Sequence, residues 1–208
     1  MIRIILADDH AVMRKGLQLF ISYEDNLTLI DEVKDGEELM QIIETKEADV
    51  LLLDLDMPKV NGLTIIPKIH ELRPDIKVII LSMHPEKIYG RMAYIKGASA
   101  YVCKDQEPSE LVHSIRRAQE GEKIFSPTTL NDKRKQRPIK FSNREVQVVK
   151  LLCQGRSNKE VGRELNISDK TVSTYKLRLL SKIEGTSTVD LLNFARLNPD
   201  AVEPSTVE

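Results

Sequence analysis

The chain has 208 residues and a mass of 23.7 kDa, a length that favours two domains and is short for three. Hydrophobic residues make up 41% and aromatic residues 4%, with no Trp, which is an ordinary globular composition without stacking platforms of aromatic rings. Residues 1–130 carry 16 Lys and Arg against 22 Asp and Glu, whereas residues 131–196 carry 15 against 7. An acidic first part and a basic second part indicate two tasks, the second on a polyanion.

Neither cysteine usage nor the N-terminal sequence indicates an exported protein. Cys103 and Cys153 form no C-x-x-C motif, so we expect buried, reduced thiols and no disulfide or zinc site. The start MIRIILADDH lacks the basic and then apolar plan of a signal peptide, and no apolar run approaches the roughly 18 residues that span a bilayer. We expect a cytoplasmic protein that does not bind membranes.

Five short runs rich in Ile, Leu and Val recur at regular intervals in the acidic part. They are almost continuously apolar, which is typical of parallel strands buried on both faces. The predicted strands are residues 2–7, 27–33, 50–55, 77–83 and 100–103. Between them, apolar residues at helical spacing predict helices at residues 11–22, 36–46, 62–72, 86–96 and 108–119. This alternation predicts an α/β doubly wound (βα)5 domain over residues 1–120.

The basic part begins with a segment that has no apolar periodicity. Residues 131–140 contain five basic side chains, and we predict a solvated linker over 121–138. Capping-box sequences at Ser142, Ser157 and Ser187, and a further start at Ser168, predict a small all-α domain over 139–198. Its predicted helices are 142–154, 157–165, 168–183 and 187–196, and a frayed tail follows at 199–208.

Polar side chains follow four of the predicted strands. They are Asp8 and Asp9 after the first, Asp54 and Asp56 at the third, Ser82 at the fourth and Lys104 after the fifth. Because ligands of open α/β sheets bind at the carboxyl ends of the strands, we expect one site. Four crowded carboxylates raise each other's pKa values unless a cation lies among them, and Mg2+ suits oxygen ligands. The set predicts a site that holds a phosphoryl group on one aspartate.

Residues 1–120 resemble the receiver domain of bacterial two-component response regulators. The resemblance rests on ADDH at 7–10, LLLDLDMPKVNG at 51–62, LSMH at 81–84 and GASAYVCKD at 97–105. It implies that Asp54 accepts a phosphoryl group from a histidine kinase. It also implies that Asp9, Asp8 through water, Asp54 and the backbone carbonyl of Asp56 bind Mg2+. Ser82 and Tyr101 would form the switch pair, and Lys104 would contact the phosphoryl group.

Two positions in the pocket vary between such receiver domains. Asp56 is acidic where many relatives carry a neutral residue, and Met83 is bulkier than the small residue common after the switch hydroxyl. We expect Met83 to hinder water and to lengthen the lifetime of the phosphorylated state.

Residues 157–176 have the spacing of a helix-turn-helix. On the second helix, Val172, Tyr175, Leu179 and Ile183 fall on one stripe, whereas Lys170, Ser173, Thr174, Leu177 and Ser181 fall on the opposite face. Small polar side chains on the outer face would let this helix approach base edges, and the flanking Lys176 and Arg178 would contact phosphates. The exposed Leu177 suits a thymine methyl group, although a solvated face with one stray leucine is the alternative.

Residues 139–196 are similar to the LuxR-type DNA-binding domain of the NarL/FixJ subfamily, through FSNREVQVVKLLCQGRSNKEVGRELNISDKTVSTYK. The resemblance implies that the helix from Ser168 enters the major groove and that the last helix forms a dimer contact. The implied DNA-binding residues are Lys170, Thr171, Ser173, Thr174, Lys176, Leu177 and Arg178, and the implied dimer contacts are Val189, Leu192 and Ala195. Ser173 and Tyr175 depart from the lysine and histidine that many members carry, so the bases that are read stay open.

We therefore expect a phosphorylation-dependent transcription regulator and not an enzyme. Its expected partners are a sensor histidine kinase, promoter DNA bound by a homodimer, and RNA polymerase. One alternative is a DNA-binding regulator controlled by a partner protein without phosphorylation. The other is a Mg2+-dependent phosphatase of the haloacid-dehalogenase type, which is disfavoured because its D-x-D motif lies on the first strand, whereas here Asp8 and Asp9 come first.

Overall fold

The computed structural model describes residues 1–131 and 138–203. The chain divides into two compact units, Met1–Gln136 and Arg137–Glu208. The predicted linker residues 132–137 and the predicted tail residues 204–208 lie outside the described residues. Among the described residues, no helix is both long and apolar enough to span a bilayer.

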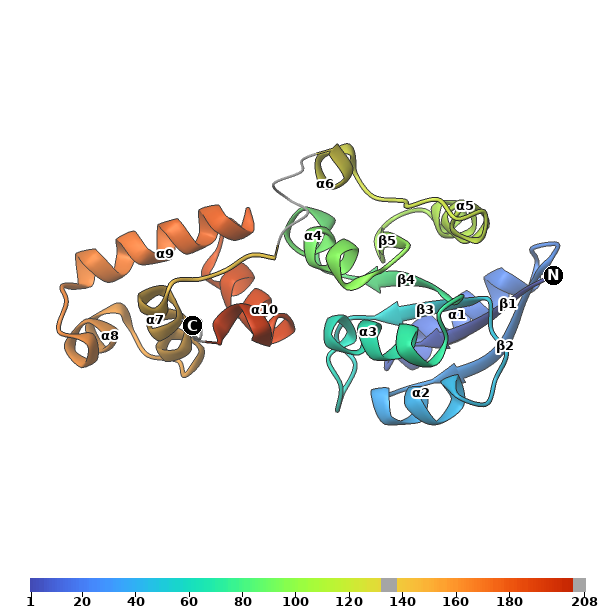
Figure 1. Ribbon diagram of the computed structural model, residues 1–208, viewed down its shortest axis with the longest axis horizontal. Helices are drawn as coiled ribbons and strands as arrows, with labels where there is room; N and C mark the ends of the chain where they lie inside the picture. The colour runs from blue at the N-terminus through green and yellow to red at the C-terminus, as the bar shows by residue number, and fades with distance from the viewer. Residues whose placement is uncertain (132–137, 204–208) are drawn as a thin grey trace. The chain divides into compact units, whose positions relative to one another are not determined.

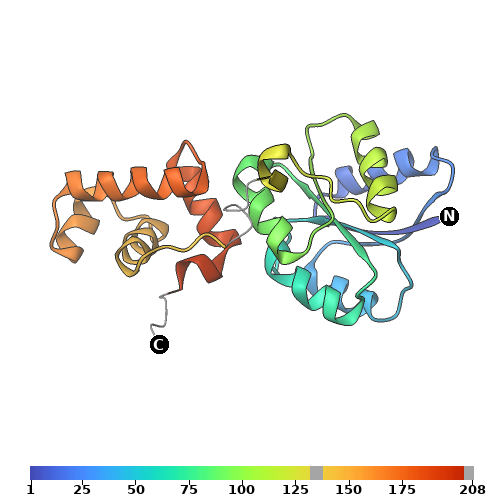
Figure 2. The ribbon, with the colours of Figure 1, turned by 45° about the horizontal axis from the view of Figure 1, so that its top comes forward.

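The N-terminal unit is a five-stranded parallel sheet between two layers of helices (Figures 1 and 2). The strands are β1 (Ile2–Ala7), β2 (Leu27–Val33), β3 (Val50–Asp54), β4 (Lys77–Ser82) and β5 (Ala100–Cys103), in the order β2-β1-β3-β4-β5. The helices are α1 (Ala11–Ser22), α2 (Gly36–Ile43), α3 (Gly62–Leu72), α4 (Glu86–Lys96) and α5 (Pro108–Gln119). The predicted (βα)5 architecture is confirmed.

Burial on both faces explains the continuous apolar strands. Every residue of β3 is buried, and the alternate side chains of each strand reach opposite helical layers. Ile4 and Leu52 contribute to a core that α1 and α5 cover through Ile21 and Ile115. The order of the strands reverses beside β1 and β3, which places the switch point of the sheet at their carboxyl ends.

Four predicted boundaries in the N-terminal unit differ from the structure. Strands β3 and β4 each end one residue earlier than predicted, at Asp54 and Ser82. Helix α2 ends at Ile43 instead of residue 46, and the backbone amides of Thr45 and Lys46 both donate to the carbonyl of Ile42 in the turn that follows. The segment 121–131 is packed on the unit instead of belonging to a linker. Ile124 pairs with the edge of β5 through Ala100, and α6 (Pro127–Asn131) follows.

The C-terminal unit contains α7 (Asn143–Cys153), α8 (Asn158–Leu165), α9 (Asp169–Ile183) and α10 (Thr188–Leu197). Capping boxes at Ser142, Ser157 and Ser187 begin α7, α8 and α10, as the sequence predicts. Their reciprocal bonds satisfy amides that the first turn of a helix leaves unpaired. The rings of Phe141 and Phe194 pack 6.0 Å apart in the core of this unit.

Two further sequence expectations are corrected here. Residues 199–202 of the predicted tail form a 3₁₀ helix, Pro199–Val202, whose Ala201 is buried against the unit. The thiol-bearing Cys153 is exposed, and Cys103 is partly exposed, so neither cysteine is a core residue. Both thiols are free, as expected.

Candidate functional site

An ion-paired pocket lies at the carboxyl ends of β1, β3 and β5. Asp8 follows β1, Asp54 ends β3, and both carboxylates are almost fully buried. Lys104, which follows β5, brings its Nζ to 2.8 Å from Oδ2 of Asp54 and to 2.8 Å from Oδ2 of Asp8. The structure thus brings together three residues that are far apart in the sequence, with one ammonium group between two buried carboxylates.

Backbone contacts hold these side chains in place. The amide of Asp8 donates to the carbonyl of Val33, and the amide of Lys104 donates to the carbonyl of Ser82. Oδ1 of Asp54 accepts from the amide of Asp56 at 3.2 Å, while its Oδ2 faces Lys104. Each carboxylate oxygen of Asp54 therefore has a positive or amide partner on a different side.

The charges of the pair are set by burial and by mutual contact. Burial raises the pKa of Asp54 above its ordinary value, and the bond from Lys104 opposes that rise. For Lys104 the balance is reversed: burial lowers its pKa, but the bonds to Asp54 and Asp8 outweigh burial and the pKa is raised. The ammonium group of Lys104 is thereby kept charged within a buried site.

Potential cation ligands cluster at Asp54. Ligand atoms of Asp8, Asp9, His10 and Asp54 all lie within 4.8 Å of one another. Three carboxylates with only one buried ammonium among them leave an excess of negative charge, and hard oxygen donors are the set that Mg2+ prefers. The residues present therefore fit a magnesium ion.

His10 is a further residue of this set, and no role for it is predicted from the sequence. Its Nδ1 lies 2.8 Å from Oδ1 of Asp9 and 3.3 Å from Oδ1 of Asp8, and its side chain is largely exposed. An imidazole at this place caps the outer side of the carboxylate set. A histidine directly after an acidic pair, at the end of a strand, was the only signal in the sequence.

The carboxylate of Asp56 contacts a histidine and is not part of the acidic set. Nε2 of His84 lies 2.9 Å from Oδ2 of Asp56, and the His84 ring packs against Tyr89 with centroids 4.8 Å apart. Of the four predicted metal ligands, Asp8, Asp9 and Asp54 lie in the acidic set, whereas the side chain of Asp56 contacts His84. This is consistent with the expectation that Asp56 would offer its backbone carbonyl.

The backbone of His84 connects the two expected switch residues. Its amide donates to Oγ of Ser82 at 3.0 Å, and its carbonyl accepts from the hydroxyl of Tyr101 at 2.9 Å. Ser82 is fully buried and Tyr101 is 5% exposed, so the ring of Tyr101 lies inside the unit in this structure. Burial raises the pKa of Tyr101 well above its ordinary value, which keeps the phenol a hydrogen-bond donor.

An apolar cavity of about 760 Å³ borders the ion-paired pocket. His10, Met83 and Lys104 line it on the side of the pocket, and α1 contributes the exposed side chains of Val12 and Leu19. Met83 is 69% exposed, so it lines the cavity from outside the core.

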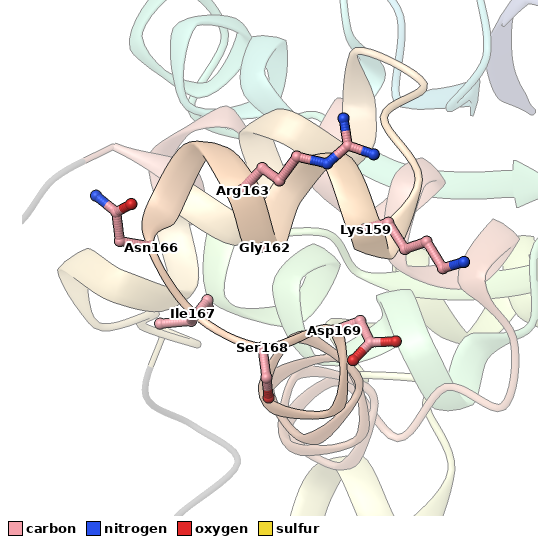
Figure 3. A pocket seen from close by; sticks show the side chains of 7 residues that line it. All are labelled: Lys159, Gly162, Arg163, Asn166, Ile167, Ser168 and Asp169. Atoms are coloured by element: carbon pink, nitrogen blue, oxygen red, sulfur yellow. The ribbon is translucent and has the colours of Figure 1, made fainter.

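In the C-terminal unit, α8 and α9 form a helix-turn-helix. Asn166 ends α8 in the left-handed conformation, with φ at 53°, which asparagine tolerates. A Cβ at Gly162 would lie 2.7 Å from the carbonyl of Ile167, so glycine permits the close approach of the turn to α8. Figure 3 shows Lys159 and Arg163 projecting from α8 beside this turn.

The outer face of α9 has the composition that the sequence predicts. Val172, Leu179 and Ile183 are buried and Tyr175 is half-buried, which fixes the orientation of the helix. The side chains on the opposite face are exposed, namely Lys170, Thr171, Ser173, Thr174, Leu177, Arg178 and Ser181, with Lys176 half-buried at the edge. Leu177 is 69% exposed, which is unusual for a leucine in the middle of a helix.

The residues expected to form a dimer contact on α10 differ in their exposure. Val189 is 63% exposed and Leu192 is half-buried, whereas Ala195 is 5% exposed. Ala195 is therefore more deeply packed than Val189 and Leu192, and the dimer contact stays a prediction for all three residues.

Comparison with known proteins assigns a family to each of the two units. Residues 4–116 match the family described as response regulator receiver domain, and residues 140–195 match the family described as bacterial regulatory proteins, luxR family. The chain is 32% identical over 204 residues to the virulence factors putative positive transcription regulator BvgA of Bordetella pertussis, covering 94% of this chain and 97% of BvgA. It is 28% identical to the response regulator UvrY of Escherichia coli, covering 94% of each.

Solved structures of full-length relatives are also similar. The RcsB–DNA complex superposes with a TM-score of 0.79 at 25% identity, covering 94% of this chain and 98% of RcsB. RcsB of Salmonella enterica serovar Typhimurium, bound to a promoter in the presence of a beryllofluoride phosphomimetic, gives 0.78 at 26% identity over 93% of this chain and 97% of RcsB. This chain belongs to the response regulators that join a receiver domain to a LuxR-type DNA-binding domain and regulate transcription.

Proposed function

We propose that a histidine kinase phosphorylates Asp54 and that this reaction controls the binding of promoter DNA by dimers of this chain. The observation that carries the proposal is the position of Lys104, whose Nζ lies 2.8 Å from both Asp54 and Asp8 in a buried pocket. A structural ion pair needs only one carboxylate. A lysine that faces two, at the switch point of an α/β sheet, is suited to contacting an added anionic group.

The chemistry assigns each side chain a task. A carboxylate oxygen of Asp54 attacks the phosphorus atom of a phosphohistidine, the P–N bond breaks, and the imidazole leaves while an acyl phosphate forms. Lys104 donates to a phosphoryl oxygen, and the amide of Asp56 keeps the other carboxylate oxygen in position. A magnesium ion held by Asp8, Asp9 and Asp54 would neutralise the charge of the phosphoryl oxygens.

The switch follows from the contacts of His84. When the hydroxyl of Ser82 turns to the phosphoryl group, its bond with the amide of His84 is altered, and the carbonyl that accepts from Tyr101 shifts with it. Tyr101 lies inward here, which is the position we assign to the active state. Phosphorylation then shifts an existing equilibrium of the β4–α4 loop toward this state.

The surroundings of the pocket suit a protein as phosphodonor. A donor histidine must come within bonding distance of Asp54, so its protein covers the adjacent surface, where Val12, Leu19 and Met83 are exposed. We assign this apolar surface to the sensor histidine kinase. DNA and RNA polymerase are assigned to the C-terminal unit, and the chain acts in the cytoplasm, where promoters are.

Binding as a dimer is supported by a relative. One similar structure is described as two RcsB dimers bound to two parallel DNAs, at 25% identity and a TM-score of 0.78. Two copies of α9 would contact half-sites about 34 Å apart, which is one turn of DNA. We assign the contact between copies in part to Val189 and Leu192 on α10.

The test is selection of genomic DNA fragments by the purified full chain in Mg2+, with and without beryllofluoride, and with Asp54→Ala as the control. Enrichment that requires beryllofluoride and is lost in the variant is the expected result, and it yields the half-site and the target genes together. Equal enrichment in all samples would indicate that a partner protein controls DNA binding instead of phosphorylation at Asp54. Turnover of a phosphate monoester by the chain would favour a phosphatase instead.

A further inference from the structure

Two hydroxyl groups on the outer face of α9 donate their hydrogen atoms to backbone carbonyls of the same helix. Oγ of Ser173 donates to the carbonyl of Asp169, and Oγ1 of Thr174 donates to the carbonyl of Lys170, each at 3.1 Å. A carbonyl oxygen can only accept, so the single hydrogen of each hydroxyl points into the helix. The lone pairs of both oxygens are what the exposed face of α9 presents.

A second helix fixes this polarity at Ser173. Nδ2 of Asn158, the first residue of α8, donates to Oγ of Ser173 at 3.0 Å. Turning the hydroxyl of Ser173 outward to donate would break its bond to Asp169 and disturb the bond from Asn158. One acceptor position then remains on Ser173, because a hydroxyl oxygen accepts at most two hydrogen bonds.

We infer that the outer face of α9 reads hydrogen-bond donors on base edges through Ser173 and Thr174, and that Asn158 is a positioning residue for Ser173. In the major groove, the donors are the N6 amino group of adenine and the N4 amino group of cytosine, whereas guanine offers only the acceptors N7 and O6. The inference rests on the proposed contact of α9 with the major groove. It excludes guanine at the base that faces Ser173.

Leu177 selects adenine over cytosine. It follows Ser173 by four residues and Thr174 by three, so the three side chains share one stripe, and 69% of Leu177 is exposed. An apolar side chain in the major groove favours the methyl group of thymine. A single A·T pair presents both an amino donor and a methyl group, so the half-site contains A·T pairs opposite this stripe.

The test uses single-atom changes in the DNA. The full chain with Mg2+ and beryllofluoride selects a site from random duplexes, and each adenine of that site is then replaced in turn by purine, which lacks the amino group. Removal of the amino group at one adenine should weaken binding about two- to tenfold, the range for one hydrogen bond. The same replacement at the other adenines controls for the lost base-pairing bond.

Variants of Ser173 and Asn158 test whether these residues cause the loss of affinity that follows removal of the amino group. Ser173→Ala should abolish the sensitivity to the amino group at this one adenine, and Ser173→Lys should change the selected base to guanine, because lysine is a donor. Asn158→Ala should bring the ratio of the affinities for the adenine site and the purine site closer to one. Its affinity for random DNA and the salt slope of binding should not change. Asn143→Ala is the matched control, because Asn143 is the exposed first residue of α7 and also follows a capping serine.

Each failure has a distinct meaning. If the chain selects no sequence, the proposed promoter binding fails, and this inference with it. If a site is selected but a guanine stands at the position that becomes variable in Ser173→Ala, the acceptor polarity is wrong and promoter binding stands. If Asn158→Ala and Asn143→Ala retain the same sensitivity to the amino group, Asn158 does not position Ser173.

Discussion

Removing the ammonium group of Lys182 should destabilise the C-terminal unit, and most strongly at neutral pH. Oε2 of Glu145 accepts from the amide of Ser142 at 2.7 Å, from Oγ of Ser142 at 2.9 Å and from Nζ of Lys182 at 2.6 Å. Glu145 is 5% exposed, whereas the side chain of Lys182 is 40% exposed. Lys182→Met would leave the buried carboxylate with its capping bonds alone.

The expected loss of stability lies between the values for exposed and for fully buried ion pairs. Exposed pairs contribute up to about 1 kcal/mol, and breaking a fully buried pair costs about 3–5 kcal/mol. With one partner buried and the other partly hydrated, we expect Lys182→Met to lower the free energy of unfolding by about 1.5–2 kcal/mol at pH 7.

The pKa of Glu145 determines how the stability deficit of Lys182→Met changes with pH. Burial raises the pKa of Glu145, but the bonds from Lys182 and Ser142 outweigh burial, so the pKa lies below its ordinary value. A carboxyl group with a lowered folded pKa stabilises the protein above its unfolded pKa, and that contribution is lost as pH falls through the folded pKa. Without Lys182 the folded pKa rises, so the deficit of the variant should shrink as Glu145 takes up a proton below about pH 4.

Hydrogen exchange of the α7 and α9 amides in the full chain measures the effect, because it reports the C-terminal unit separately. Glu160→Gln is the matched control. Glu160 forms the equivalent capping box with Ser157 at the start of α8, where both residues are exposed, so its loss of charge should cost less than about 0.5 kcal/mol. A deficit for Lys182→Met below about 0.5 kcal/mol at pH 7, or an equal deficit at pH 7 and at about pH 3, would refute the reasoning.

Four further substitutions have defined outcomes. In Gly62→Ala the new Cβ would lie 2.6 Å from the carbonyl oxygen of Asp54, so urea unfolding should show a loss of about 1–3 kcal/mol and slower phosphorylation. Met83→Ala should shorten the lifetime of the phosphorylated state, measured by loss of radioactive phosphate, and unchanged or slower decay would contradict this. Lys176→Ala should reduce the salt slope of DNA binding by about 1, and an unchanged slope would remove it from the phosphate contacts. Tyr101→Phe removes the bond that attaches the ring to the β4–α4 loop, so the beryllofluoride effect on DNA affinity should fall about two- to tenfold, and equal responses would exclude this link.

The elements that the sequence predicts correctly are those with a local physical cause. A strand buried on both faces must be apolar at every position, and this makes Val50–Asp54 recognisable without knowledge of its neighbours. A capping box needs only two residues three apart, so the starts of α7, α8 and α10 follow from Ser142, Ser157 and Ser187. The clustering of Asp8, Asp54 and Lys104 follows from the geometry of any parallel sheet.

The missed features depend on contacts between distant segments. Residues 121–131 lack periodicity because a single backbone pairing at Ile124 and a five-residue helix need none. The bond from Asn158 to Ser173 depends on how closely α8 and α9 cross, and that distance depends on Gly162 and the turn.

His84 illustrates why the signalling step needs more than the residues of the pocket. Ser82 can respond to a phosphoryl group only locally, because it is buried at the end of β4. In the proposed switch, the amide and carbonyl of His84 would convert that response into a movement of the β4–α4 loop, since they bind Ser82 on one side and Tyr101 on the other. Two residues later, Glu86 at the start of α4 accepts from the amide of Ser126 at 2.7 Å and from Oγ1 of Thr129, so the end of this loop is connected to α6. In the proposed switch, a shift of this loop would therefore act on α6.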